Sequence, residues 1–175
     1  MNIVLIGHRA SGKSSVGRRL AISLGRDFVD TDELIVSEAG MTIRAIFEHE
    51  SKTRFQARER DVVHATAAGD AHVIAVNDSA VVDDENRRLL RASGVIVWLR
   101  ASAEVLWERA SRDAATHAMR PDLTDAGGPA EVLAMLARRE PMYRSMSQLT
   151  IDTESMDPDR VCQRIKGELA DRGLL

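Results

Sequence analysis

The sequence predicts one three-layer α/β domain spanning residues 1–175, with helices on both faces of a parallel sheet. Three observations predict it. Short apolar runs alternate with stretches of helical periodicity. A glycine-rich loop joins the first of these runs to the first helix. The chain also has the length of one domain, with no internal repeat and no interdomain linker.

The expected strands are the short apolar runs, at residues 2–6, 27–32, 72–76, 95–99 and 149–152. Helices are expected between them, where apolar residues recur at helical spacing. They span 13–24, 33–39, 42–49, 54–68 and 83–92, with one that begins at Ser102, one that ends near 139 and one that begins at Asp157. Gly25 and Gly40 end the first two helices, and Asp157-Pro158 opens the last.

The loop after the first strand is the most informative segment. Its sequence, Gly7-His8-Arg9-Ala10-Ser11-Gly12-Lys13-Ser14, matches G-x-x-x-x-G-K-[ST] between a strand and a helix. Backbone N–H groups of such a loop and the positive end of the helix make an anion site. Lys13 is expected to reach the β- and γ-phosphates of a nucleotide, and Ser14 to bind Mg²⁺. Further nucleotide contacts are expected from Gly7, Ala10, Ser11, Gly12 and Ser15.

The second expected strand ends in two carboxylates, Asp30 and Asp32. Ligands of open α/β sheets collect beyond the carboxyl ends of the strands. Residues two apart in an extended segment face the same side, so both are expected to point at the crevice beside the phosphate loop. One of them also suits the cap of the next helix. Asp32 is the expected functional residue.

Residues 113–128 are polar and irregular, and they contain Arg120-Pro121 and end in two glycines. Polar loops of this length in a compact domain are often lids, and the glycines offer a hinge. The alternative is a solvated surface excursion.

Composition excludes several classes of protein. The net charge of −3, from 24 basic and 27 acidic residues, indicates no nucleic-acid surface. No segment is long enough to span a membrane, and the apolar start is too short for a signal peptide. The one cysteine, Cys162, fits a reducing compartment. We therefore expect a cytoplasmic monomer without nucleic-acid or membrane partners.

The phosphate loop alone does not define the reaction. Signalling GTPases need a strand ending in Asp-x-x-Gly and an Asn-Lys-x-Asp motif, and the chain has neither. A carboxylate pair and an arginine-bearing loop suit a small-molecule kinase. Lys13, Mg²⁺ and Arg120 would stabilise charge on the transferred phosphoryl group. Asp32 would orient the acceptor hydroxyl and accept its proton, and lid closure would exclude water.

The chain resembles the shikimate kinases nearly end to end. The resemblance covers the phosphate loop, Phe28–Asp32, Gly40–Phe47, Phe55, Glu59, Arg120-Pro121, Arg138–Tyr143 and Ile151–Thr153. It implies a P-loop kinase fold with a five-stranded parallel sheet. It also implies transfer of the γ-phosphate of ATP to the 3-hydroxyl of shikimate, with Mg²⁺, in aromatic amino acid biosynthesis.

The same resemblance implies roles for individual residues. Asp32 would contact the acceptor hydroxyls, and Asp30 would hold waters of the Mg²⁺ ion. Arg120 would meet the phosphates and Arg109 would pack on the adenine. Arg139 would bind the carboxylate of shikimate.

Two departures from the family pattern fall in the acceptor pocket. Gln56 stands where the family carries an arginine that clamps the carboxylate, and Arg60 is one helical turn away. Losing that charge-assisted contact should weaken carboxylate binding roughly ten- to a hundredfold. Asn77, Asp78 and Ser79 replace three glycines. They add side chains, and Asp78 adds a negative charge, where an anionic substrate would sit. Asn and Asp tolerate left-handed backbone, so the turn is expected to survive.

The sequence thus leaves three functions open. The first is phosphorylation of shikimate. The second is phosphorylation of another, less anionic hydroxylated molecule. The third is nucleotide binding without catalysis. The intact set of Lys13, Asp32 and Arg120 favours the two kinases, so we expect an ATP- and Mg²⁺-dependent kinase of shikimate kinase type.

Overall fold

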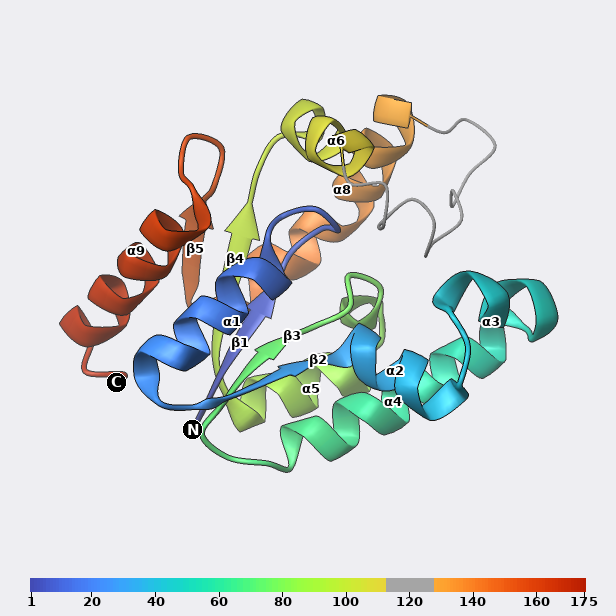
Figure 1. Cartoon of the computed structure of the whole chain (residues 1–175), viewed down its shortest axis with the longest axis horizontal. Coiled ribbons are helices and arrows are strands. Elements are labelled where there is room, and N and C mark those ends of the chain that lie inside the picture. Colours follow the sequence, from blue (N-terminus) through green and yellow to red (C-terminus); the bar gives the residue numbers. More distant parts are fainter. Residues whose placement is uncertain (113–127) are drawn as a thin grey trace.

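The computed structural model describes residues 1–112 and 128–175. Its centre is a parallel sheet of five strands, β1 (Asn2–Ile6), β2 (Asp27–Asp30), β3 (His72–Ala75), β4 (Gly94–Arg100) and β5 (Leu149–Asp152). The strands lie in the order β2-β3-β1-β4-β5 (Figure 1). The predicted three-layer α/β fold and its five-stranded sheet are confirmed.

Helices cover both faces of this sheet (Figure 1). The bounds are α1 (Lys13–Leu24), α2 (Thr31–Ala39), α3 (Ile43–His49), α4 (Lys52–Ala67), α5 (Asp84–Ser93), α6 (Ala103–Arg112), α8 (Gly128–Met146) and α9 (Pro158–Asp171), with a short 3₁₀ turn η1 (Ala80–Val82). Helices α1 and α9 pack on one face, and α4, α5 and α8 pack on the other. Within the described residues, no helix combines the length and apolar character needed to cross a bilayer.

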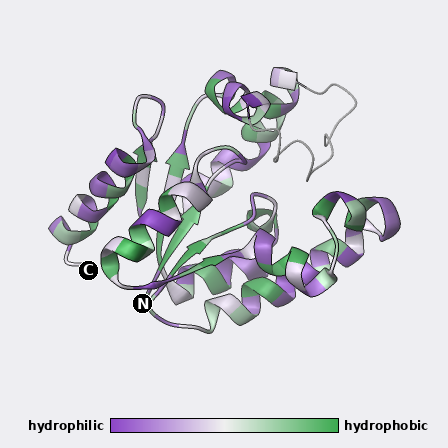
Figure 2. Ribbon diagram, in the orientation of Figure 1, coloured by the Kyte–Doolittle hydropathy of each residue, from purple (hydrophilic) through white to green (hydrophobic). Residues whose placement is uncertain are grey.

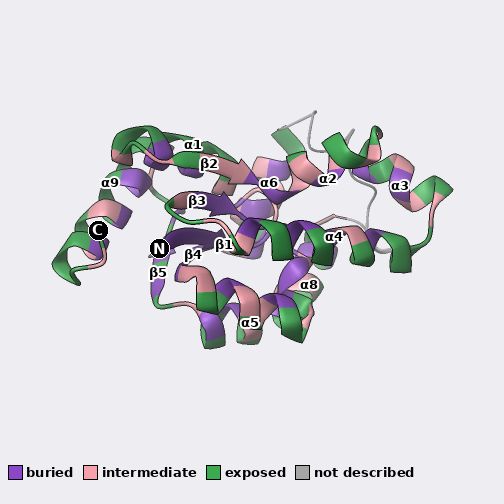
Figure 3. Cartoon of the chain, turned by 90° about the horizontal axis from the view of Figure 1, so that it is seen from below, coloured by how far each residue is buried: buried purple, intermediate pink, exposed green. Residues whose placement is uncertain are grey.

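The three central strands, β1, β3 and β4, are buried because each contributes side chains to both core layers. In β1, Ile3 and Leu5 pack with α1 and α9, whereas Val4 and Ile6 pack with the helices opposite. This alternation follows from the two-residue period of a strand, and burial on both faces explains the continuous apolar runs. Figure 2 shows the hydrophobic strands, and Figure 3 shows the exposed residues on the outer surfaces of the helices.

Helix α8 continues to Met146, past the expected end near residue 139, although Pro141 lies inside it. Proline removes a helical hydrogen bond and usually ends a helix. Here the turns beyond Pro141 carry Tyr143 and Met146, which are fully buried. The rings of Tyr143 and Trp98 lie 5.8 Å apart. Packing against the sheet therefore offsets the cost of the proline, and the shorter helix was a wrong prediction.

Substitution of Gly7, the residue that follows β1, is expected to cause a measurable loss of stability. Its φ is +144°, and a Cβ there would lie 2.5 Å from the carbonyl oxygen of Leu99. Gly7→Ala should lower the free energy of unfolding by about 2–4 kcal/mol, from backbone strain and overpacking. Urea denaturation measures this change. Gly25→Ala is the control, because Gly25 also has positive φ but no atom lies within 4 Å of its added Cβ. An equal loss in both variants would contradict the overpacking.

Candidate functional site

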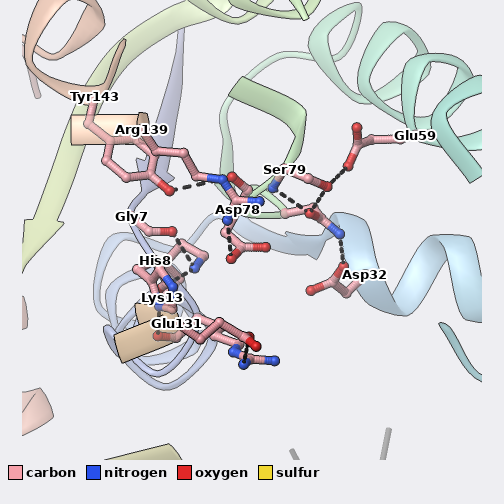
Figure 4. Close-up of polar contacts among 12 residues, drawn as sticks. Gly7, His8, Lys13, Asp32, Glu59, Asp78, Ser79, Glu131, Arg139 and Tyr143 are labelled. Atoms are coloured by element: carbon pink, nitrogen blue, oxygen red, sulfur yellow. Dashed lines mark hydrogen bonds and ion pairs between the residues drawn. The ribbon is translucent and has the colours of Figure 1, made fainter. Parts of the chain in front are cut away.

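The loop between β1 and α1 folds around the ammonium group of Lys13. The Lys13 Nζ atom donates to the carbonyl oxygens of Gly7, at 2.8 Å, and His8, at 3.0 Å (Figure 4). Gly12 precedes the helix with a φ of +95°. These contacts hold a cation beside the N-terminus of α1, where an anionic ligand is favoured. The loop has the geometry expected of a phosphate site.

Asp30 uses its two carboxylate oxygens for two different contacts. Its Oδ1 atom accepts the backbone N–H of Asp32 at 3.0 Å and so caps α2. Its Oδ2 atom accepts the Ser14 hydroxyl at 2.6 Å. A hydroxyl and a carboxylate oxygen side by side suit Mg²⁺, which prefers oxygen ligands and keeps several waters. The capping and metal-site interpretations of Asp30 are therefore compatible.

No group of three acidic, histidine or cysteine side chains suited to a metal is found in the part of the chain that the structure describes. The neighbouring oxygens of Ser14 and Asp30 fit a Mg²⁺ ion that keeps most of its ligands from outside the protein. Such an ion would take its remaining ligands from phosphates and water, as is usual for Mg²⁺ bound with a nucleotide.

Asp32 lies in the first turn of α2, and not at the end of a strand as predicted. The strand ends at Asp30, because that residue already caps the helix. Asp32 nevertheless faces the same crevice. It lines a cavity of about 500 Å³ together with Lys13 and Asp30. The cavity is also lined by Arg9, Ala10, Gly12, Ser14, Ser15, Glu33, Val36, Ser37, Ile43, Val76 and Asp78.

A second, smaller hollow of about 180 Å³ lies on the other side of the phosphate loop. Ala10, Ser11 and Gly12 line it, with Arg109 of α6 and Thr153 after β5. The guanidinium of Arg109 donates to the Thr153 hydroxyl, at 3.0 Å, and to its carbonyl oxygen. Arg109 is thus held by Thr153, the residue that follows β5.

The turn after β3 forms without left-handed residues. Asn77, Asp78 and Ser79 have negative φ, because Ala10 and Ala71 are the non-glycine residues with positive φ in the described ranges. The Asn77 side chain accepts the backbone N–H of Ser79 at 2.8 Å. The turn survives as expected, but it does not use the left-handed tolerance of Asn and Asp, since none of the three residues has a positive φ.

The same turn connects three helices through its side chains (Figure 4). The Asn77 amide donates to Asp32 of α2. The Ser79 hydroxyl lies within hydrogen-bonding distance of both Glu59 of α4 and Asn77 Oδ1, and donates its single proton to one at a time. The turn thereby fixes the orientation of Asp32.

The third connection of the turn is a buried ion pair with α8. Arg139 Nη1 donates to Asp78 Oδ2 at 2.7 Å, and the two side chains are 6% and 3% exposed. Burial lowers the pKa of Arg139, but Asp78 and Tyr143 together raise it more, so the guanidinium stays charged. Tyr143 donates to the carbonyl oxygen of Asp78 at 3.4 Å. Burial and the Asp78 charge raise the pKa of Tyr143, so its hydroxyl stays protonated.

Residues 9–170 match the family model described as shikimate kinase. The chain belongs to the shikimate kinase family. A shikimate kinase of Symbiobacterium thermophilum is 42% identical over 99% of this chain and 98% of the relative. One of Xanthomonas euvesicatoria is 35% identical over 97% and 92%. Among solved structures, a shikimate kinase from Acinetobacter baumannii in complex with shikimate has a TM-score of 0.92 at 33% identity, covering 99% and 95%.

In this member of the shikimate kinase family, the residues expected to bind the acceptor do not all lie where the sequence predicted. Arg139, the predicted carboxylate ligand, is paired with Asp78 and does not line the 500 Å³ cavity. Gln56 is exposed on α4 and is also outside the lining. Arg60 lies 3.4 Å from Asp83, in the direction of α5, and is half exposed. Of the predicted acceptor residues, Asp32 and Asp78 reach the cavity wall.

Arg120 and all but the last residue of the predicted lid, 113–128, lie outside the described residues. Sequence reasoning assigned no role to His8 or Tyr143. Each is more than nine-tenths buried and each is close to Asp78. A polar residue in a phosphate loop was the available signal for His8, whereas the burial of Tyr143 depends on the unexpected extension of α8.

The buried His8 is expected to make the stability of the folded protein depend on pH. Burial lowers its pKa below the ordinary 6.5, with Lys13 and Arg139 acting in the same direction against Asp78 and the Arg9 carbonyl. As the pH falls, His8 therefore binds a proton in the unfolded chain at a higher pH than it does in the folded protein. Stability contributed by neutral His8 is complete above pH 6.5 and falls as the pH drops below it. His8→Gln should reduce the loss of melting temperature between about pH 7.5 and about pH 5.5. Equal losses in both proteins would contradict this assignment.

Proposed function

We propose that this protein is an ATP- and Mg²⁺-dependent kinase that transfers the γ-phosphoryl group to a hydroxyl of a small molecule. One observation carries the proposal. Lys13 and Ser14 at the start of α1 and Asp32 at the start of α2 line one cavity. Phosphoryl transfer needs phosphates, metal and acceptor positioned together, and little covalent chemistry from the protein.

Each residue then has one task. Lys13 stabilises charge on the phosphates, and Ser14 and Asp30 hold Mg²⁺ and its waters. Mg²⁺ supplies charge neutralisation across the phosphates when it is bound. Asp32 accepts a hydrogen bond from the acceptor hydroxyl and takes its proton as transfer proceeds. Arg109 stacks on the base, and Arg120 remains a predicted phosphate contact.

Two acceptors are candidates. Shikimate is supported by membership of the family and by the relative solved in complex with shikimate. A different hydroxylated molecule is supported by the ion pair of Asp78 with Arg139 and by the exposed Gln56. We also propose that the chain is a single domain that acts as a monomer in the cytoplasm. The buried free Cys162 suits the reducing conditions there.

The test is release of ADP from Mg-ATP with and without shikimate and other small polyols, with nucleotide affinity measured separately. Acceptor-dependent release supports the kinase and identifies its acceptor. ATP binding without transfer to any acceptor would instead support a nucleotide-binding regulator.

Lys13→Ala should lower kcat in this assay by about 10²–10³-fold, because it removes a preorganised cation from the transferred group. Lys52→Ala is the matched control, since Lys52 is an exposed lysine on α4 outside the cavity. A Lys13→Ala protein that keeps its transfer rate would contradict the role of the loop.

A further inference from the structure

The acceptor side of the cavity has a built-in carboxylate. Asp78 lies in contact with Arg139, and the pair is buried. An incoming carboxylate would have to displace Asp78 from Arg139 to bind there. Breaking a buried ion pair is strongly unfavourable, and Asp78 is already in place on the same chain. Arg139 therefore offers little attraction to an acidic acceptor.

The wall around Asp78 also repels acids. Asp32, Glu33 and Asp78 all line the cavity. Within the described lining residues, the cations are Arg9 and Lys13, and both belong to the phosphate loop. Arg9 is paired with Glu131 at 3.0 Å, and Lys13 is held by loop carbonyls. Like charges close to one another disfavour binding, so the acceptor side is unsuited to an anion.

The remaining lining suits a neutral polyol. Val36, Ile43 and Val76 provide apolar surface for a carbon skeleton. The Asp32 and Asp78 carboxylates accept hydrogen bonds from hydroxyl groups. Asn77 orients Asp32 through its amide. Recognition is thus built from hydroxyl donors and carbon surface, with no described cation on this wall to receive a carboxylate.

We propose that Asp78 sets the acceptor specificity by occupying Arg139, and that the acceptor is a small polyol that has no carboxylate. This inference rests on the proposed kinase function and names the substrate class of that same site. It makes Asp78 a specificity-determining residue and not a member of the phosphoryl-transfer machinery.

The first experiment compares two acceptors that share a ring and hydroxyl groups, shikimate and its uncharged methyl ester. In the native protein, kcat/KM for the ester should exceed that for the acid by at least about tenfold, a difference equivalent to one lost charge-assisted contact. The double variant Asp78→Gly/Gln56→Arg should reverse the preference by a similar factor. A native preference for the acid would overturn the inference and leave the kinase function intact.

If the native protein phosphorylates neither shikimate nor its methyl ester, the activity of the double variant tests the inference. A gain of transfer to shikimate supports the inference, and its absence overturns it. ATP affinity and Lys13-dependent ADP release report separately on the kinase function, so the two failures are distinguishable.

The second experiment does not depend on turnover. Asp78→Gly, and Asp78→Asn where the glycine variant does not fold, expose Arg139 to added carboxylates. Shikimate at about ten times its Kd should raise the melting temperature of the variant by about 3–6 °C, whereas the methyl ester should not. The native protein should show neither shift. Glu50→Gln is the matched control. Glu50 forms an ion pair with Arg58 of α4 at 2.9 Å, and neither residue lines the cavity. Equal stabilisation of all three proteins by shikimate would overturn the inference.

Discussion

Asp32→Ala is expected to lower kcat by about 10²–10⁴-fold with the best acceptor, because it removes the group that we propose orients the acceptor hydroxyl and takes its proton. Asp32 lies in the first turn of α2 and receives a hydrogen bond from Asn77. Asp32 is not among the proposed nucleotide contacts, which lie on the phosphate loop, on α1 and at Arg109 and Arg120, so the affinity for ATP should change little. Steady-state kinetics and a separate nucleotide-binding measurement check the two parts of this prediction.

Glu38→Ala is the control for Asp32→Ala. Glu38 lies on the same helix, is exposed and does not line the cavity, so its variant should keep the native rate. Asp32→Asn tests the same role with the side-chain shape kept, because an amide cannot accept the proton. A loss of less than about tenfold in both Asp32 variants would contradict proton transfer to Asp32.

Asp78→Ala is expected to lower the free energy of unfolding by about 3–5 kcal/mol, because the guanidinium of Arg139 would lose the carboxylate that compensates its charge. Removing the charge on both sides should be much less costly, so Asp78→Ala/Arg139→Leu should recover most of the loss. Urea denaturation of the native protein, the single variant and the double variant measures this cycle. A double variant as unstable as the single one would show that packing, and not charge, dominates at this position.

The fold could be predicted from the sequence because its signals are local. The loop from Gly7 to Ser14 combines a strand, a turn and a helix in one motif, and the structure has these elements at the expected residues. The sequence correctly predicted that Asp32 faces the cavity beside the phosphate loop, but it wrongly placed Asp32 at the end of a strand. Its neighbour Asp30 begins the helix earlier than the strand pattern indicated.

The contacts of the expected acceptor residues could not be predicted from the sequence, because they join distant parts of the chain. Asp78 and Arg139 are 61 residues apart, and neither carries a local sign that it pairs with the other. The sequence indicated a negative charge at Asp78 but not its partner. The continuation of α8 through Pro141 likewise depends on tertiary burial of Tyr143, which outweighs the local effect of proline.

The turn at residues 77–79 has a consequence for how this protein can evolve. Its three side chains contact Asp32, Arg139 and Glu59, which lie on three different helices. Residues that share partners in one network do not contribute additively. Single reversions to glycine at this turn should therefore be poor intermediates, and mutational paths between the two types of acceptor site should be strongly epistatic. Ancestral reconstruction would then be expected to find the turn and its helical partners changing together.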